Sequence, residues 1–170
     1  MRIDIWSDIV CPFCYVGKRN LEQALAEFEH RDEVEVVWHS FELDPSATEH
    51  PAGSLPELIA GKYQMSLEQA IASQESLAER AREVGLDFNW RQARYGNTFD
   101  AHRVIHYAAE QGLASAAQEA FKLAYFTQGR SVQDHESILD IAYEIGLDTA
   151  EVEAVLKSNR YAADVRADEQ

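Results

Sequence analysis

The feature that most constrains this chain is a pair of cysteines, Cys11 and Cys14, placed between an apolar extended run and an amphipathic helix. Two cysteines separated by two residues lie one helical turn apart, near enough to close a small disulfide. A thiol in the first turn also faces unpaired backbone N–H groups and the positive end of the helix dipole, which favours its thiolate. Pro12 suits this position because it has no N–H and its φ is already helical. The pattern indicates a redox site.

Composition and charge limit the alternatives. The chain has 170 residues, of which 46% are hydrophobic, enough for a sizeable core. A net charge of −15 argues against nucleic acid or an anionic membrane surface as a partner. The N-terminus lacks the features of a signal peptide, and no apolar run approaches the ~18 residues of a membrane span. We therefore expect a cytoplasmic protein whose two cysteines serve chemistry rather than crosslinking.

Hydrophobic periodicity predicts a strand, a helix and a second strand in the first part of the chain. Residues 2–7 alternate as in a strand. The second strand is expected over residues 34–41, apolar on both faces. Together they form a βαβ unit with a right-handed crossover, followed by a loop that includes Asp44-Pro45 and residues 51–56. The intervening helix places four apolar residues on one face: Leu21, Ala24, Leu25 and Phe28.

From Ser66 onward the pattern predicts only helices. Ser66 and Gln69 form a capping box that opens the first of them. Three helices end at a Gly-Leu pair, which is typical of the Schellman motif. These pairs are Gly85-Leu86, Gly112-Leu113 and Gly146-Leu147. The later helices are expected over residues 98–111, 113–128, 135–145 and 149–158, with a last segment from Tyr161.

Three motifs carry a family resemblance: Asp-Ile-Val-Cys-Pro-Phe-Cys-Tyr at 8–15, Phe-Glu-Leu-Asp-Pro at 41–45, and Asn97 with Ala-His-Arg at 101–103. Together they resemble the DsbA-like thioredoxin-fold proteins, in the cytoplasmic FrnE-type branch that includes relatives of 2-hydroxychromene-2-carboxylate isomerase. The resemblance implies an α/β, thioredoxin-like fold of the DsbA type with a large all-helical insertion after strand 2. It divides the chain into the first half of the thioredoxin-like domain with the CPFC site (1–45), a helical insertion (46–160) and the start of a returning helix (161–170).

The second half of such a domain is where this chain departs from the family. That half holds a β-hairpin, which begins at a cis-proline, and a final helix. Here the four prolines all precede residue 57, and the chain ends inside a predicted helix. We therefore expect the hairpin and its helix to be missing, either from a fragment or because a partner chain completes the sheet. The second strand would then have an open edge, through which a homo-oligomer could form.

The two cysteines are given different roles. Cys11, at the helix start, is expected to be the more exposed and to act as the nucleophile, whereas Cys14 should be more buried and resolve the mixed disulfide. Pro12 and Phe13 tune the pair, and Phe13 cannot donate a hydrogen bond to a thiolate, which predicts a milder oxidant than DsbA. Asp4 is either a buried acid that relays a proton to Cys14, as in relatives, or a solvent-facing strand residue.

Four further residues are assigned a structural or a functional role. Asp8 is expected to be a turn residue before the helix. Asn97, His102 and Arg103 are candidates for contact with a substrate or glutathione. For His102 the alternative is a histidine on the apolar side of its helix, bonded to backbone. A zinc site lacks ligands, because there is no second cysteine pair and the six histidines are scattered.

The predicted activity is that of a thiol-disulfide oxidoreductase or isomerase, which acts on a disulfide-containing protein or a low-molecular-weight thiol. Attack of a thiolate on a disulfide needs no metal or organic cofactor, though glutathione could serve as co-substrate. Two alternatives stay open: a glutathione-dependent isomerase of a small aromatic substrate, and a non-catalytic acidic interaction module. Oxidase, reductase and isomerase differ only in redox poise, which the sequence does not determine.

Overall fold

The computed structural model describes residues 1–48 and 51–170. The expected βαβ unit is present: β1 (Arg2–Ser7) and β2 (Glu35–Ser40) form a parallel sheet, joined by α1 (Pro12–Glu27) and a short 3₁₀ helix (Arg31–Glu33). The register pairs Ile3 with Val36 and Ser7 with Ser40. No strand follows β2 in the described residues, which agrees with the predicted absence of the family's hairpin.

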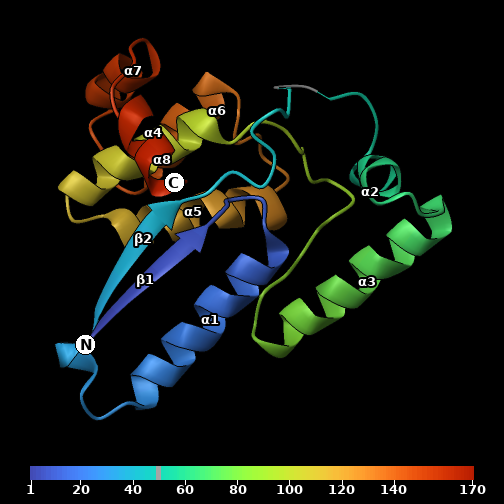
Figure 1. Ribbon diagram of the computed structural model, residues 1–170, viewed down its shortest axis with the longest axis horizontal. Helices are drawn as coiled ribbons and strands as arrows, with labels where there is room; N and C mark the ends of the chain where they lie inside the picture. Colours follow the sequence, from blue (N-terminus) through green and yellow to red (C-terminus); the bar gives the residue numbers. More distant parts are fainter. Residues whose placement is uncertain (49–50) are drawn as a thin grey trace.

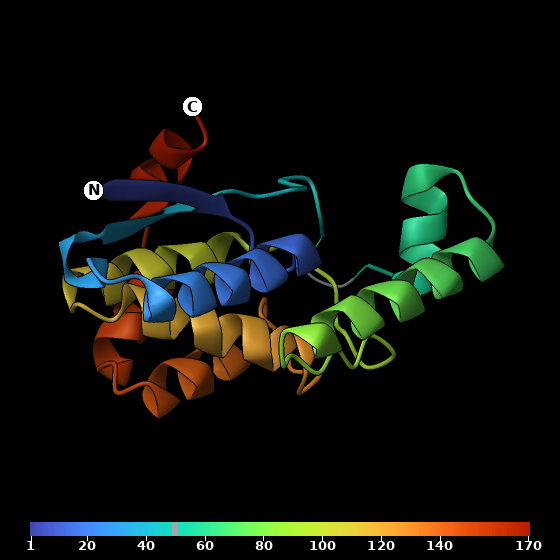
Figure 2. The ribbon, with the colours of Figure 1, turned by 90° about the horizontal axis from the view of Figure 1, so that it is seen from below.

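The elements are arranged in layers. Figure 2 shows the sheet lying on a layer formed by α1, α4 and α5, with α6 and α7 farther out. The pair α2 and α3 projects away from the sheet (Figure 1), and α8 returns to lie against β2. The helices after β2 are α2 (Leu55–Tyr63), α3 (Leu67–Glu83), α4 (Phe99–Glu110), α5 (Ala114–Phe126), α6 (His135–Glu144), α7 (Thr149–Leu156) and α8 (Ala162–Asp168).

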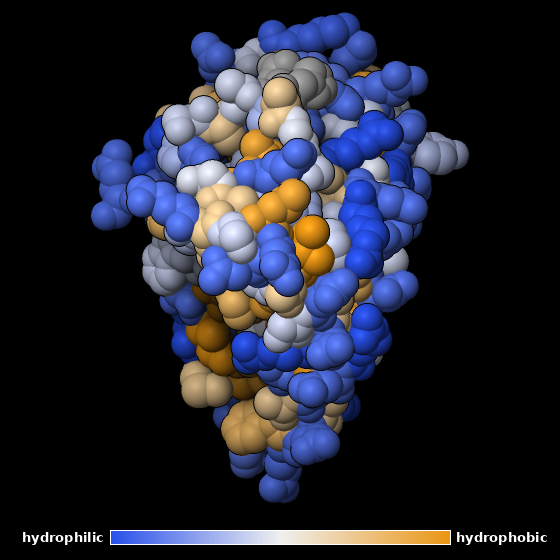
Figure 3. Space-filling view, turned by 90° about the vertical axis from the view of Figure 1, so that its right-hand side faces the viewer, coloured by the Kyte–Doolittle hydropathy of each residue, from blue (hydrophilic) through white to orange (hydrophobic). Residues whose placement is uncertain are grey.

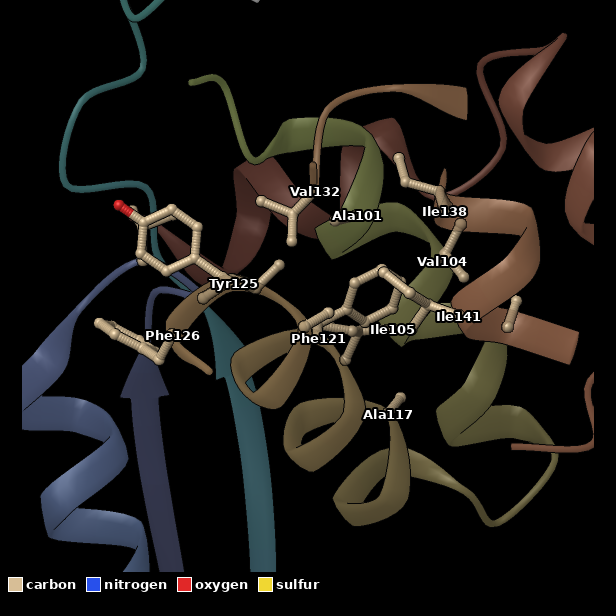
Figure 4. Packing of buried hydrophobic residues seen from close by; sticks show 14 of the residues in the cluster. Ala101, Val104, Ile105, Ala117, Phe121, Tyr125, Phe126, Val132, Ile138 and Ile141 are labelled. Carbon is tan, nitrogen blue, oxygen red and sulfur yellow. The ribbon is translucent and has the colours of Figure 1, made fainter. Parts of the chain in front are cut away.

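The hydrophobic core is one continuous cluster that joins the cysteine-bearing segment to the helices. Ile9 and Tyr15, on either side of the cysteines, belong to the same cluster as the buried faces of α4 to α7. Figure 4 shows Phe121 between α5 and α4, while Tyr125 and Phe126 extend from the end of α5 toward the sheet. The start of α1 is therefore held by packing against the helical layer.

Helix ends follow the local signals in the sequence. Gly85, Gly112 and Gly146 all adopt positive φ, and the leucine after each donates its N–H five residues back, as in Leu86 N to Ala81 O at 2.9 Å. These are the predicted Schellman ends. Ser66 and Gln69 also form the predicted capping box at the start of α3.

The prediction of a loop over residues 51–56 is wrong for its last two residues, because α2 begins at Leu55. Ser54 is its N-cap, and the Glu57 carboxylate accepts both the N–H (2.7 Å) and the hydroxyl (2.8 Å) of Ser54. Pro56 lies in the first turn, where the N–H it lacks has no helical partner in any case. The pattern Ser-x-x-Glu with a proline in the first turn is typical of a helix start.

The edge of β2 is less open than predicted, because carboxylates at the end of α8 and just after it bond to the last residue of the strand and to Glu42 beyond it. The Asp168 carboxylate accepts the backbone N–H of Ser40 at 2.7 Å, and that of Glu169 accepts the N–H of Glu42 at 3.1 Å. Arg166 pairs with the buried carboxylate of Glu42. Carboxylates thus occupy donors that an added strand would use.

The surface on the side of α2 and α3 is mostly polar. Figure 3 shows the side that carries α2 and α3 as largely hydrophilic, with smaller hydrophobic areas between polar groups. Across residues 1–48 and 51–170, none of the helices combines the length and apolar character that crossing a bilayer requires.

Candidate active site

The two cysteines occupy the start of α1, as predicted. Cys11 is the N-cap and Pro12 the first helical residue. The Cys11 Sγ accepts the backbone N–H of Cys14 at 3.3 Å, so the sulfur takes the place that a serine or aspartate oxygen has in an ordinary cap. Both thiols are free. This bond places the Cys11 sulfur at the positive end of the helix.

The relative exposure of the pair is opposite to the prediction. Cys11 is buried, with 8% of its surface exposed, whereas Cys14 is half-buried. The Cys11 side chain folds back over the first turn to accept the Cys14 N–H, which turns its sulfur away from solvent. Phe13, between the two, is 61% exposed and lies at the surface beside them.

The two thiols shift each other's pKa in opposite directions. Interaction with the Cys11 side chain lowers the pKa of Cys14 to about 6 against the opposing effect of burial, helped by the backbone N–H of Asp8 and the Ser7 hydroxyl. Interaction with Cys14, together with burial, raises the pKa of Cys11. Because the two thiols interact, the first ionisation belongs to the pair. The site therefore favours one thiolate in the reduced pair.

Asp8 is the buried acid of the site. It is 2% exposed, and its carboxylate accepts the N–H of Ile9 at 2.7 Å and of Leu43 at 2.8 Å, with His102 Nε2 at 3.3 Å. Burial would raise the pKa of Asp8, but the bonds from His102 and Leu43 outweigh it and lower the pKa. Asp8 also accepts the N–H of Cys11 through its carbonyl at 3.5 Å, so it is the expected turn residue as well.

Lys122 lies below the cysteines on α5 and is completely buried. Its ammonium donates to the Asp8 carbonyl at 3.2 Å and to the side-chain oxygen of Gln118 at 2.7 Å. Burial lowers the pKa of Lys122 to about 8, while the charges of Cys14, Asp8 and Cys11 act in the opposite direction. A cation therefore lies close to the cysteine pair.

Asp4 is not brought to the cysteines. Its side chain is exposed on the sheet, where it bonds to Arg2 at 2.8 Å and to His39 Nε2 at 2.8 Å. Of its two interpretations, the solvent-facing strand residue is the one found, because β1 points Asp4 and Trp6 away from α1. Trp6 stacks on His39 across the sheet, on that same face.

The candidate residues on α4 and just before it have partners within the protein. His102 is fully buried and bonds to the Asp8 carboxylate rather than to backbone. Arg103 is buried and caps the end of α7 by donating to the carbonyls of Val155 and Ser158. Asn97 accepts the N–H of Phe99 at 2.9 Å, which starts α4, and lies 3.4 Å from Glu42 Oε1.

Sequence reasoning missed Lys122 and Gln118 and gave Asp8 too small a role. A signal for the first two exists, because Gln118 and Lys122 are four residues apart beside the apolar stripe of Phe121 and Tyr125. Polar residues at that spacing on a core face indicate a buried polar pair. No group of three or more metal-ligating side chains is found in the part of the chain that the structure describes.

Comparison with known proteins identifies the family. The sequence model of the DSBA-like thioredoxin domain family matches residues 2–170, so the chain belongs to that family. A probable DsbA oxidoreductase from Streptomyces coelicolor has the same fold with a TM-score of 0.94 and 47% identity, covering 99% of this chain and 73% of that one. The resemblance seen in the cysteine motif and the α4 motif is thereby confirmed.

Two further proteins are similar to this chain, one in sequence and one in fold. YwbO of Bacillus subtilis is 28% identical over 162 residues, which is 95% of this chain and 74% of YwbO. The cytosolic disulfide reductase DsbM from Pseudomonas aeruginosa, solved with GSH, has a TM-score of 0.67 and 18% identity and covers 99% of this chain and 77% of DsbM. At that identity the likeness to DsbM is one of fold.

Proposed function

We propose that this chain is a thiol-disulfide oxidoreductase that works through Cys11 and Cys14. The observation that carries the proposal is a pair of free thiols at a helix N-terminus, where the Cys11 sulfur accepts the backbone N–H of Cys14 at 3.3 Å. The pKa of Cys14 is lowered to about 6, and a lowered thiol pKa favours the thiolate that exchange requires. Membership of a family that contains a probable DsbA oxidoreductase at 47% identity supports the same reaction.

The exchange proceeds in two steps with a mixed disulfide between them. The Cys11 thiolate attacks one sulfur of a substrate disulfide, and the other substrate sulfur leaves as a thiolate. Cys14, having lost its proton to solvent or to the leaving thiolate, then attacks Cys11, and the second substrate sulfur leaves. The substrate gains two electrons and the protein is left with the Cys11–Cys14 disulfide. In the oxidising direction the same steps run in reverse.

Cys11 is assigned the attacking role because its sulfur accepts a backbone N–H at the helix start. The lowered pKa and greater exposure of Cys14 are the observations that favour the opposite order. If Cys11 attacks, the Cys14→Ser variant traps the mixed disulfide; if Cys14 attacks, the Cys11→Ser variant does. An experiment can therefore separate the two orders. Either order leaves the overall reaction unchanged.

The test is a redox titration of the purified chain against mixtures of reduced and oxidised glutathione. After acid quenching, maleimide labelling and intact mass report the two thiols. A single two-electron transition is expected, together with turnover of a glutathionylated peptide or a protein disulfide. The variant carrying both Cys11→Ser and Cys14→Ser is the control and should show neither. A pair that stays reduced at every ratio would contradict the proposal.

Redox exchange explains Cys14 better than the glutathione-dependent isomerase does. An isomerase that holds glutathione on one residue gains nothing from a second thiol one turn away, because that thiol would resolve any mixed disulfide. Glutathione enters the proposal as a reducing co-substrate in the cytoplasm, and the fold shared with a DsbM structure solved with GSH supports its inclusion. Self-association through the rest of the β2 edge also stays a prediction, for light scattering to test.

A further inference from the structure

Lys122 is a buried cation that lacks a carboxylate as hydrogen-bond partner among the described residues. Its two partners are a backbone carbonyl, that of Asp8, and the amide oxygen of Gln118. Both are neutral. A buried ammonium group pays a large desolvation cost unless an anion lies nearby, so the position needs a compensating negative charge.

The Asp8 carboxylate compensates it only in part. That carboxylate is directed at other donors, namely the N–H groups of Ile9 and Leu43 and the ring of His102. The two thiols also lie within electrostatic range of the Lys122 ammonium, as does the ammonium of Lys18. The cysteine pair is thus the group whose charge changes with redox state beside a fixed buried cation.

We propose that Lys122 sets the reduction potential of the Cys11–Cys14 pair by stabilising its thiolate form. The inference rests on the proposed function, since it requires the pair to cycle between disulfide and dithiol. Lys122 is a positioning residue: it touches the Asp8 turn rather than the substrate. The Asp8 carbonyl that accepts from Lys122 also accepts the N–H of Cys11, so the cation holds the turn that carries the pair.

The charge balance fixes the direction of the effect. Reduction adds two electrons to the disulfide and breaks the S–S bond, and at neutral pH one sulfur takes a proton from solvent while the other stays a thiolate. Lys122 faces no charge on the disulfide and one negative charge on the reduced pair. It therefore favours the reduced state and makes the pair more oxidising. A charge at short range shifts a pKa by about 1–3 units.

The experiment compares three variants with the wild-type chain in the same glutathione titration. Lys122→Met removes the charge with little change of volume. Lys122→Gln also removes the charge but keeps a donor for the Asp8 carbonyl. Lys18→Met is the matched control, because Lys18 is another buried lysine, and it is bound to Glu22 and Glu119. Circular dichroism and thermal melts establish that each variant is folded.

Both Lys122 variants should favour the disulfide about tenfold more than the wild-type chain does, which is about 30 mV for a two-electron couple. The pH midpoint of iodoacetamide labelling should rise by about one unit. Lys18→Met should leave both values unchanged. If Lys122→Met shifts the potential but Lys122→Gln does not, the hydrogen bond rather than the charge is responsible and the inference fails. It also fails if neither shifts it. A wild-type chain that shows no redox transition overturns the proposed function instead.

Discussion

Two buried lysines are held by the α1 and α5 helices in opposite ways. Lys18 of α1 donates to the carboxylates of Glu22 and Glu119, both at 2.5 Å. Arg19 and the Tyr15 hydroxyl join the same Glu119 carboxylate, each at 2.7 Å. Among the described residues, Lys122 of α5 donates to a backbone carbonyl and a side-chain amide oxygen and to no carboxylate. The Lys18 network joins α1 to α5 through Glu119, whereas Lys122 contacts the Asp8 turn that precedes the cysteines.

The difference shows how a fold separates stability from chemistry. Carboxylates balance the charge of Lys18 within the protein. Its ion pairs join two helices and require no further anion. A lysine left without a matching carboxylate lowers the stability of the fold unless a nearby group supplies negative charge. Near Lys122 that group is the cysteine pair, whose charge depends on its redox state. The comparison predicts that variants in the two regions affect different measurements.

The largest effect is expected from the cysteines themselves. Cys11→Ser should abolish exchange, because the attacking sulfur is lost. Cys14→Ser should still attack and should accumulate a mixed disulfide with glutathione, because the resolving sulfur is lost. Intact mass after incubation with oxidised glutathione gives the readout. If instead the Cys11→Ser variant accumulates the adduct and Cys14→Ser stays unmodified, the two roles are exchanged.

Asp8→Ala should cause the next largest effect, a loss of about 3–5 kcal/mol in the free energy of unfolding. The substitution leaves the buried His102 ring and the buried N–H of Ile9 without their partner. Its control is Asp4→Ala, on the exposed face of the sheet, which should cost far less stability because exposed ion pairs contribute little. Urea unfolding at pH 7 measures both, and equal losses would contradict the assignment of Asp8 as the buried acid.

The Asp8 effect should also depend on pH. Because the pKa of Asp8 is lower in the folded chain than its ordinary value of 3.8, the carboxylate contributes its full stabilisation above that value. The contribution is lost as the pH falls below it toward the folded pKa. The difference between wild type and Asp8→Ala should therefore shrink in urea unfolding below about pH 4.

Lys18→Met should lower stability without changing the redox pair. Glu119 keeps Arg19 and Tyr15 as partners after the change, so we expect a loss of about 2 kcal/mol, between the values for exposed and buried pairs. The glutathione titration should match that of the wild-type chain. A shifted potential in this variant would show that any buried cation near α1 acts on the cysteines, and the distinction between the two regions would be lost.

The parts of the structure that the sequence predicts are those fixed by neighbouring residues. The strand before Cys11, the capping box at Ser66 and the Gly-Leu helix ends each depend on fewer than ten consecutive residues, and each is present. The exposure of the two cysteines and the partners of Asp8 and Lys122 depend on how α1, α4 and α5 pack. Segments distant in the sequence decide these, so local patterns predicted the cysteine pair but not its buried polar surroundings.

The smallest effect is expected on the outer face of the sheet. A third charged cluster there tests whether ion pairs away from the cysteines leave the reduction potential of the cysteine pair unchanged. His39 lies between the carboxylates of Asp4 and Asp168, both at 2.8 Å, and His106 lies 3.2 Å from Asp168. Burial lowers the pKa of His39, but the bonds to the two carboxylates outweigh it and raise the pKa above 6.5. Trp6 stacks on the ring without charge.

A raised pKa means that the folded chain binds the His39 proton more tightly than the unfolded chain does. The stabilisation is complete below about pH 6.5 and is lost as the pH rises through the folded pKa. His39→Gln should therefore cost less than about 1 kcal/mol at pH 6 and still less at pH 9, measured by urea unfolding. The redox potential should be the same as in wild type at both pH values. A stability difference that stays constant between pH 6 and 9 would show that His39 holds α8 without its charge.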